Sequence, residues 1–189
     1  MDKYTNLKLH SSKPISTAFR ALGKYTFTDA CNYLQHLYYQ RISDRNNYNL
    51  VLSEHCGTCS SKHALLKALA IENKFSSFNL CIGIYKMNSL NTKGIGTVLN
   101  DYNLQYIPEA HTYLKDGDSI LDITGLGESN QRFSKSLLYE ESISPEDVGD
   151  YKVNLHKTFI KEWIHSNAIP YTFDVIWNLR EQCIANLSA

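Results

Sequence analysis

Residues 55–63 read HCGTCSSKH, and this stretch decides how the chain around it is interpreted. It holds two cysteines, two histidines and a lysine. The preceding YNLVL, residues 48–52, predicts a short strand or an extended segment, and a helix is predicted from about Cys59 to Asn73. The apolar face of this helix consists of Leu65, Leu66, Leu69 and Ala70. The two cysteines are therefore expected where an extended segment leads into a helix.

A metal site is the first chemistry that such a stretch suggests. Structural zinc takes four ligands, which usually come from two separate pairs. The chain has no second C-x2-C or H-x3-H pair. The remaining cysteines stand alone in apolar surroundings, where a cysteine usually packs as a small hydrophobe: Cys31, Cys81 and Cys183. We therefore expect neither a metal nor a cofactor.

A redox dithiol is the second interpretation. A strand, then C-G-T-C, then a helix is the order of a thioredoxin-like site, in which the first cysteine, here Cys56, attacks. The 55 residues before Cys56 exceed what that fold needs. A thioredoxin-like oxidoreductase stays open as an alternative, as does a catalytically silent binding module.

A nucleophilic cysteine is the third interpretation. If Thr58 caps the helix, Cys59 becomes its first residue and lies at the positive end of the helix dipole. A thiol at that position ionises more readily, and it becomes a nucleophile when a base and a group that orients the base are nearby.

The segment HTYLKDGDSILDIT, residues 111–124, supplies a base and an orienting group. Asp-Gly favours a two-residue type I′ turn, and a turn centred on Asp116 and Gly117 places His111 opposite Asp122. Directly opposed side chains lie on one face of the hairpin, so the carboxylate can orient the imidazole. Glu109 is expected to point to the other face of the strand and is left out of the site.

These residues resemble a known family. The blocks GTCSSKHALLKALA, EAHTYL and LDIT occur in the order found in the transglutaminase-like superfamily, a group related to papain, over roughly residues 50–125. The resemblance implies a cysteine-bearing helix packed on a small antiparallel sheet, with Cys59 as nucleophile, His111 as base and Asp122 as its orienting partner. The family usually has an aromatic residue directly after the histidine, where this chain has Thr112.

The chemistry implied by this triad is acyl transfer through a thioester. We expect an enzyme that acts on an amide or peptide, with water or an amine as the acceptor. The backbone N–H of Cys59 is one expected oxyanion donor, and Gln35, Gln40 and Asn49 are candidates for the second.

The other elements predict an α+β protein with a helical C-terminal third. Helices are expected over residues 27–42, with Thr26 as cap, and beyond the S-P-E-D signature at residues 144–147. NLCIGIYKM, residues 79–87, predicts a buried strand, and residues 88–105 a loop with a short helix. A polar loop is expected after the hairpin.

Size and charge set the remaining expectations. A chain of 189 residues predicts a single domain over 1–189, with its core at 48–125 and a helical part at 144–189. The formal net charge of zero gives no reason to expect nucleic acid as a partner. We see no signal peptide, no membrane-spanning run and no disulfide-rich pattern, which predicts a cytoplasmic protein.

Overall fold

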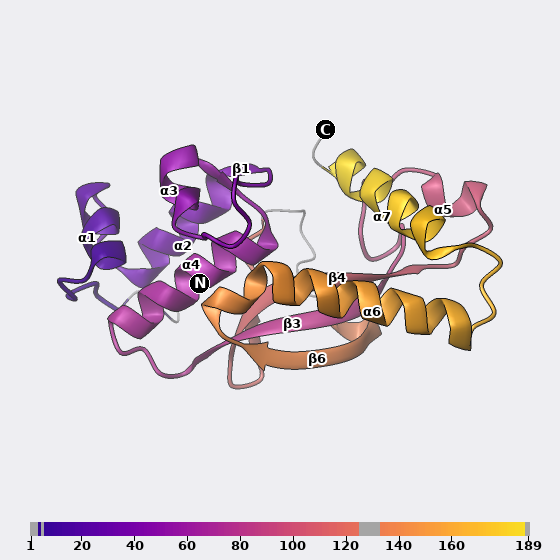
Figure 1. Ribbon diagram of the computed structural model, residues 1–189. Coiled ribbons are helices and arrows are strands. Elements are labelled where there is room, and N and C mark those ends of the chain that lie inside the picture. The colour runs from indigo at the N-terminus through magenta and orange to yellow at the C-terminus, as the bar shows by residue number, and fades with distance from the viewer. Residues whose placement is uncertain (1–3, 5, 125–132, 188–189) are drawn as a thin grey trace. The chain divides into compact units, whose positions relative to one another are not determined.

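The computed structural model describes residues 4, 6–124 and 133–187 (Figure 1). Within this part, seven helices accompany a four-stranded antiparallel sheet and a two-stranded parallel pair, which confirms the α+β class. The polar loop predicted between the hairpin and residue 144 lies partly on residues 125–132, outside the described part. Where the structure describes that stretch, residues 137–143 form a strand instead of a loop.

The helices and strands follow one another along the whole chain. In order they are α1 (Pro14–Ala21), α2 (Phe27–His36), β1 (Tyr38–Tyr39), α3 (Leu50–Glu54), β2 (Cys56–Gly57), α4 (Cys59–Glu72), β3 (Phe78–Met87), α5 (Val98–Asp101), β4 (Ile107–Asp116), β5 (Ser119–Leu121), β6 (Leu137–Ile143), α6 (Asp150–Ser166) and α7 (Phe173–Leu187). Short 3₁₀ helices, η2 (Phe133–Ser136) and η3 (Pro145–Val148), flank β6. The sheet has the order β5-β4-β3-β6, and β1 pairs with β2 in parallel.

The chain forms two compact units, each built from separate segments. Unit 1 comprises Met1–Cys81, Thr112–Gly125 and Ser142–Gly149, and unit 2 comprises Ile82–His111, Leu126–Glu141 and Asp150–Ala189. The long strands β3 and β4 each contribute residues to both units.

Helix α4 is the centre of unit 1. Its predicted apolar face is confirmed, since the four residues Leu65, Leu66, Leu69 and Ala70 are all fully buried. Lys62, His63 and Ala64 are fully buried as well, so α4 has almost no solvent-exposed side over its first three turns. Phe27 of α2 stacks on Phe78 of β3 in the same core, with ring centroids 4.6 Å apart.

The C-terminal end of α4 holds the N-terminal segment of the chain. The Glu72 carboxylate accepts hydrogen bonds from the backbone N–H groups of Ile15 and Ser16, at 3.1 and 2.7 Å, and from the Ser16 hydroxyl at 2.6 Å. Lys13, the N-cap of α1, provides no side-chain cap. Glu72 therefore caps α1 from a distant part of the chain and places a negative charge at its positive end.

Helices α6 and α7 belong to unit 2, and they confirm the helical C-terminal third that the sequence predicts. Buried apolar side chains recur along both helices: Ile160 and Trp163 on α6, and Ile176, Leu179 and Cys183 on α7. The Trp163 indole donates a hydrogen bond to the Tyr106 hydroxyl at 3.0 Å. Pro145, predicted to begin a helix, begins η3, and α6 follows from Asp150.

Two segments near the cysteines differ from expectation. Thr26 caps α2 as predicted, because its hydroxyl accepts the Asp29 N–H at 3.1 Å, but α2 ends at His36 rather than at residue 42. The following residues extend because they pair with Cys56–Gly57 as β1. Residues 48–52 were expected to be extended, but residues 50–54 form the short helix α3, which ends at His55 in the left-handed conformation with φ of 53°.

Helix α1 and strand β6 are among the elements that the sequence did not predict. Helix α1 lacks a local capping side chain, and its cap, Glu72, is far away in sequence. Strand β6 lies at an edge of the sheet and is mostly exposed or half-buried, so it lacks the apolar alternation by which strands are found.

Among the described residues, we find no helix that combines the length and the apolar character needed to cross a membrane.

Replacing Glu72 tests the distant cap of α1. We expect Glu72→Gln to lower the free energy of unfolding by about 1–3 kcal/mol, because an amide nitrogen would face a backbone donor and the charge at the helix start would be lost. Denaturant titration measures the change, with Glu162→Gln on an exposed part of α6 as the control. Equal stability of the two variants would contradict the cap.

Candidate functional site

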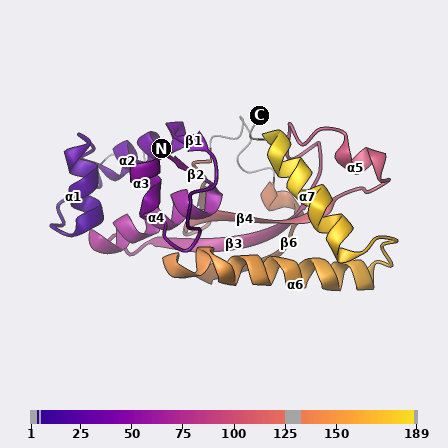
Figure 2. The same cartoon turned by 45° about the horizontal axis from the view of Figure 1, so that its top comes forward.

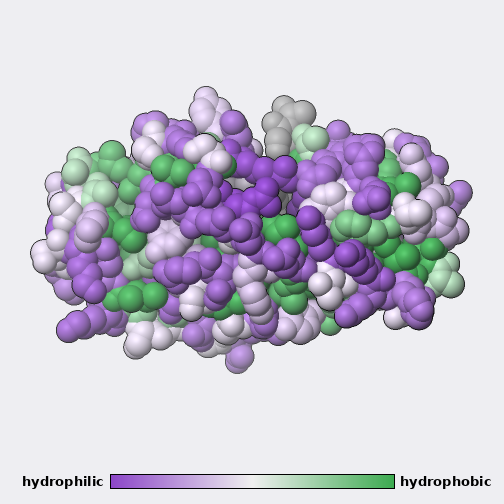
Figure 3. All heavy atoms as spheres, viewed as in Figure 1, coloured by the Kyte–Doolittle hydropathy of each residue, from purple (hydrophilic) through white to green (hydrophobic). Residues whose placement is uncertain are grey.

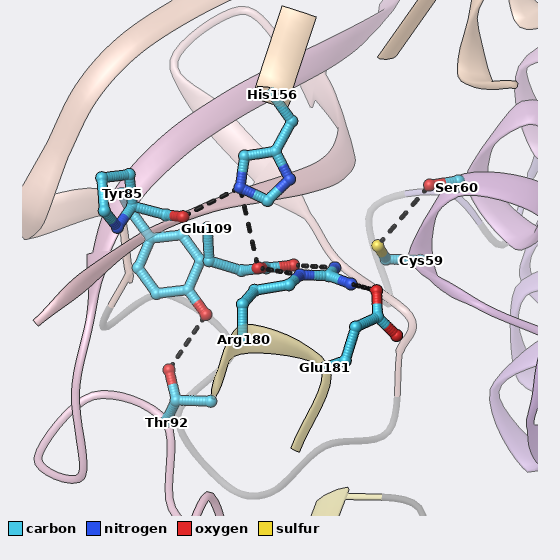
Figure 4. Close-up of polar contacts among 9 residues, drawn as sticks. Cys59, Ser60, Tyr85, Thr92, Glu109, His156, Arg180 and Glu181 are labelled. Carbon is cyan, nitrogen blue, oxygen red and sulfur yellow. Dashed lines mark hydrogen bonds and ion pairs between the residues drawn. The ribbon is translucent and has the colours of Figure 1, made fainter. Parts of the chain in front are cut away.

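The start of α4 is built from the C-G-T-C stretch. Strand β2 carries Cys56, Thr58 is the N-cap, and Cys59 is the first residue of the helix. The Thr58 N–H donates to the Ser61 hydroxyl at 3.1 Å. Figure 4 shows the Cys59 sulfur directed toward the Ser60 hydroxyl, 3.9 Å away. The predicted placement of Cys59 at the helix start is confirmed.

The two cysteines of this stretch have different surroundings. Cys56 belongs to a strand, and its sulfur lies 4.0 Å from the Arg41 carbonyl oxygen. Burial raises the pKa of the Cys56 thiol, and the nearby Glu54 carboxylate raises that pKa further. Cys56 is therefore held as a thiol, whereas Cys59 lies at a helix N-terminus, where a thiolate is favoured.

Lys62, near the start of α4, has no contact with solvent. It is fully buried, and its ammonium donates to the Leu37 carbonyl oxygen at 2.7 Å. Burial lowers the pKa of Lys62 to about 8, an effect that Cys56 and Cys59 partly oppose. Helix α4 is buried on nearly every side over its first three turns, which leaves Lys62 no solvent face.

His63 joins α4 to the end of the hairpin. It is fully buried, its Nδ1 lies 2.8 Å from the Cys59 carbonyl oxygen, and its Nε2 lies 3.0 Å from the Ile123 N–H nitrogen. A carbonyl can only accept and a backbone N–H can only donate, so Nδ1 carries the proton and Nε2 is an acceptor. His63 is thus fixed as a neutral imidazole.

Asp122 lies in unit 1, next to this histidine. Its carboxylate oxygen Oδ1 is 3.6 Å from His63 Nε2 and accepts the Thr124 N–H at 3.0 Å. Because His63 Nε2 already accepts from Ile123, it has no proton to donate to the carboxylate. Unit 1 therefore brings together Cys59, Asp122 and a histidine other than the one predicted.

The register of the hairpin differs from the prediction. Leu114 pairs with Leu121, and Asp116 pairs with Ser119, so the turn is centred one residue later than expected. Gly117, with φ of 60°, takes the first central position, as in a type II′ turn. The predicted register, which placed His111 directly opposite Asp122, is therefore wrong, and a contact between these two side chains stays a prediction.

His111 belongs to unit 2, where two aromatic rings flank it. Its imidazole meets Phe133 edge to face, with ring centroids 4.8 Å apart, and Tyr85 at 6.4 Å. The Tyr85 hydroxyl forms a hydrogen bond with the Thr92 hydroxyl, at 2.9 Å between the two oxygens (Figure 4). His111 is half-buried, unlike His63. Contact between His111 and Cys59 stays a prediction.

Glu109, left out of the site, is the centre of a buried charge network in unit 2. Figure 4 shows Arg180 binding both of its carboxylate oxygens, at 2.7 and 2.6 Å, with His156 at 3.9 Å. Burial alone would raise the pKa of Glu109, but Arg180 and His156 hold it below the usual value. The expectation that Glu109 faces away from His111 was wrong, because residues two apart in a strand project to the same face.

The described residues contain no group of three or more His, Cys, Asp or Glu side chains that could hold a metal ion. All five cysteines are buried and free of disulfide bonds. Comparisons of the chain with models of protein families, with curated proteins and with solved structures give no match.

The tautomer of His63 can be observed directly. We expect a long-range ¹⁵N–¹H spectrum at neutral pH to show the proton on Nδ1, because the Cys59 carbonyl and the Ile123 N–H leave no other arrangement. The His63→Gln variant assigns the resonance by its loss. A proton on Nε2 would contradict the contact with Ile123.

Proposed function

We propose that this protein is a cysteine-dependent acyl-transfer enzyme of transglutaminase-like fold, acting on an amide or peptide through a thioester. Cys59 is its nucleophile, His111 its general base and acid, and Asp122 a polar group of the same site. Hydrolysis and transfer to an amine are both outcomes of this chemistry.

The observation that carries the proposal is the position at which α4 begins. The helix has 14 residues and starts at Cys59, the second cysteine of C-G-T-C. Its dipole therefore favours a thiolate at Cys59, while Cys56 lies in a strand before the helix.

The different surroundings of Cys56 and Cys59 favour acyl transfer over thioredoxin-like redox chemistry. In a redox site of that kind, the attacking thiol is the first cysteine, and it needs a lowered pKa. Here the pKa of Cys56 is raised by burial and by Glu54. This difference favours Cys59 as the reactive residue and acyl transfer as the reaction.

The assignment of the base follows from the state of the two histidines. His63 is closer to Cys59 in sequence, but both of its ring nitrogens are bonded to backbone groups. A general base must accept a proton from the thiol or water and return it to the leaving group. His111, which is half-buried on β4, is the histidine to which we assign this role.

In the proposed mechanism, the Cys59 thiolate attacks the carbonyl carbon of the substrate amide and forms a C–S bond. The oxyanion that results accepts a hydrogen bond from the Cys59 backbone N–H. His111 donates a proton to the amide nitrogen as the C–N bond breaks, which leaves a thioester and a free amine. Water or a second amine then attacks the thioester, gives its proton to His111, and restores the thiolate.

A pair of matched cysteine variants tests the choice of nucleophile. We expect an activity-based peptide electrophile, such as a peptidyl acyloxymethyl ketone, to label the wild type and Cys56→Ala at Cys59, and not to label Cys59→Ala. Mass spectrometry of the labelled peptide identifies the residue. Labelling of Cys56 alone, together with reduction of a disulfide substrate, would instead support the redox interpretation.

A second test concerns the base. We expect His111→Gln to slow acylation of Cys59 by about 10²–10⁴-fold, because proton transfer to the leaving group is lost. His63→Gln serves as the control, since His63 binds backbone and has no part in proton transfer. Equal rates for the wild type and His111→Gln would remove His111 from the mechanism.

A further inference from the structure

Lys62 lies across the stretch that connects the two cysteines. A Cβ atom added to Gly57 would come within 2.9 Å of Lys62 Cγ, so the lysine chain packs directly against the residue that follows Cys56. Lys62 is also three positions after Cys59 on α4, and residues with this spacing are neighbours on a helix surface.

The end of the Lys62 side chain is fixed as well. Its Nζ donates to the carbonyl oxygen of Leu37 at 2.7 Å. Leu37 immediately precedes Tyr38, which pairs with Cys56 where β1 meets β2. The Lys62 ammonium is therefore held beside β2, the strand that carries Cys56. It also lies close to the N-terminus of α4, which begins with Cys59.

We propose that Lys62 is a positioning residue for the nucleophile, an internal cation that favours the thiolate of Cys59 over its thiol. This role rests on the proposed function, because a stabilised thiolate matters only if Cys59 is the nucleophile. No ion or ligand from outside the protein is required for this role. Cys59 releases its proton to form the thiolate, and Lys62 remains protonated as the ammonium.

The groups around Lys62 direct its effect to Cys59. The titratable groups that act on this cluster are Glu54 from α3, Cys56 from β2 and Cys59 from α4. Lys62 interacts favourably with the thiolates of both Cys56 and Cys59. Burial and Glu54 nevertheless keep the pKa of Cys56 raised, so Cys59 is the thiol whose ionisation we expect the cation to support. Since the pKa of Lys62 is about 8, this support is present at neutral pH and fades as pH rises through that value.

The described surface carries single exposed apolar side chains, among them Tyr38 and Leu90. On the face shown in Figure 3, hydrophobic residues are scattered among hydrophilic ones. Single exposed apolar residues are normal and do not define a docking site.

The first experiment measures thiol ionisation without any acyl substrate. We expect Lys62→Met to lower the rate of Cys59 alkylation by iodoacetamide at pH 6.5 by about tenfold or more, since loss of a nearby opposite charge raises a thiol pKa by at least about one unit. Peptide mass spectrometry reads Cys59 and Cys56 separately. An unchanged rate at Cys59 would overturn the proposal.

Lys67→Met is the matched control. Lys67 lies on the same helix, and its ammonium also donates to a backbone carbonyl, that of Phe78, but its neighbouring thiol is Cys81. We expect this variant to change the Cys59 rate less than twofold. A tenfold loss in both variants would mean that disturbance of α4, and not the charge of Lys62, sets the reactivity.

A reciprocal experiment needs no change at Lys62. Coupling between two titrating sites is mutual, so removal of the Cys59 thiolate must lower the pKa of Lys62 below its wild-type value. The ¹³Cε shift of Lys62, followed with pH in the wild type and in Cys59→Ser, measures this change. Identical titration curves would overturn the proposal even if Lys62→Met failed to fold.

These measurements separate the two proposals. If the acyl probes fail to label Cys59 while the Lys62 coupling is observed, the proposed reaction is wrong and the charge pairing stands. If the probes label Cys59 while Lys62→Met leaves its ionisation unchanged, only the role of Lys62 is wrong.

Discussion

The folding of unit 1 depends on the burial of α4, because a helix that is buried over most of its length must provide partners for its polar side chains. The helix meets this requirement with backbone groups of four other segments. Lys62 binds the carbonyl before β1, Lys67 binds the first residue of β3, His63 binds the residue after Asp122, and Glu72 binds the start of α1. Lys62, Lys67, His63 and Glu72 thus each fix a different neighbour. Figure 2 shows α1, α2 and α3 beside α4.

The same contacts position the N-terminal end of α4, where Cys59 lies. β1 pairs with β2 beside the carbonyl that Lys62 binds, and β2 leads through Thr58 into Cys59. His63 then ties the first turn of α4 to the chain just beyond β5. The position of the sulfur is therefore determined by several elements that meet at one helix end.

The sequence predicted what depends on local chemistry. Thr26 and Thr58 marked the beginnings of α2 and α4, and the apolar run of residues 79–87 marked β3. It failed where a distant group decides the outcome: the cap of α1 comes from Glu72, and the end of α2 is set by pairing with β2. The hairpin was found, but its register was not, because Gly117 can begin a turn as well as end one. The contacts of His63 and Lys62 could not be predicted, because their partners are backbone atoms, which leave no mark in a sequence pattern.

The contacts of α4 also determine which residues of unit 1 can be replaced by others. A side chain that binds a backbone carbonyl or N–H makes no demand on the identity of the residue that supplies it. Leu37, Phe78 and Ile123 could be exchanged for other residues of similar size without removing the atoms that Lys62, Lys67 and His63 bind. Proline at position 123 is the exception, since it lacks the N–H. The residues that supply these backbone groups should therefore tolerate substitution, whereas the polar residues of α4 should not. We expect sequence changes in unit 1 to accumulate around α4 rather than within it.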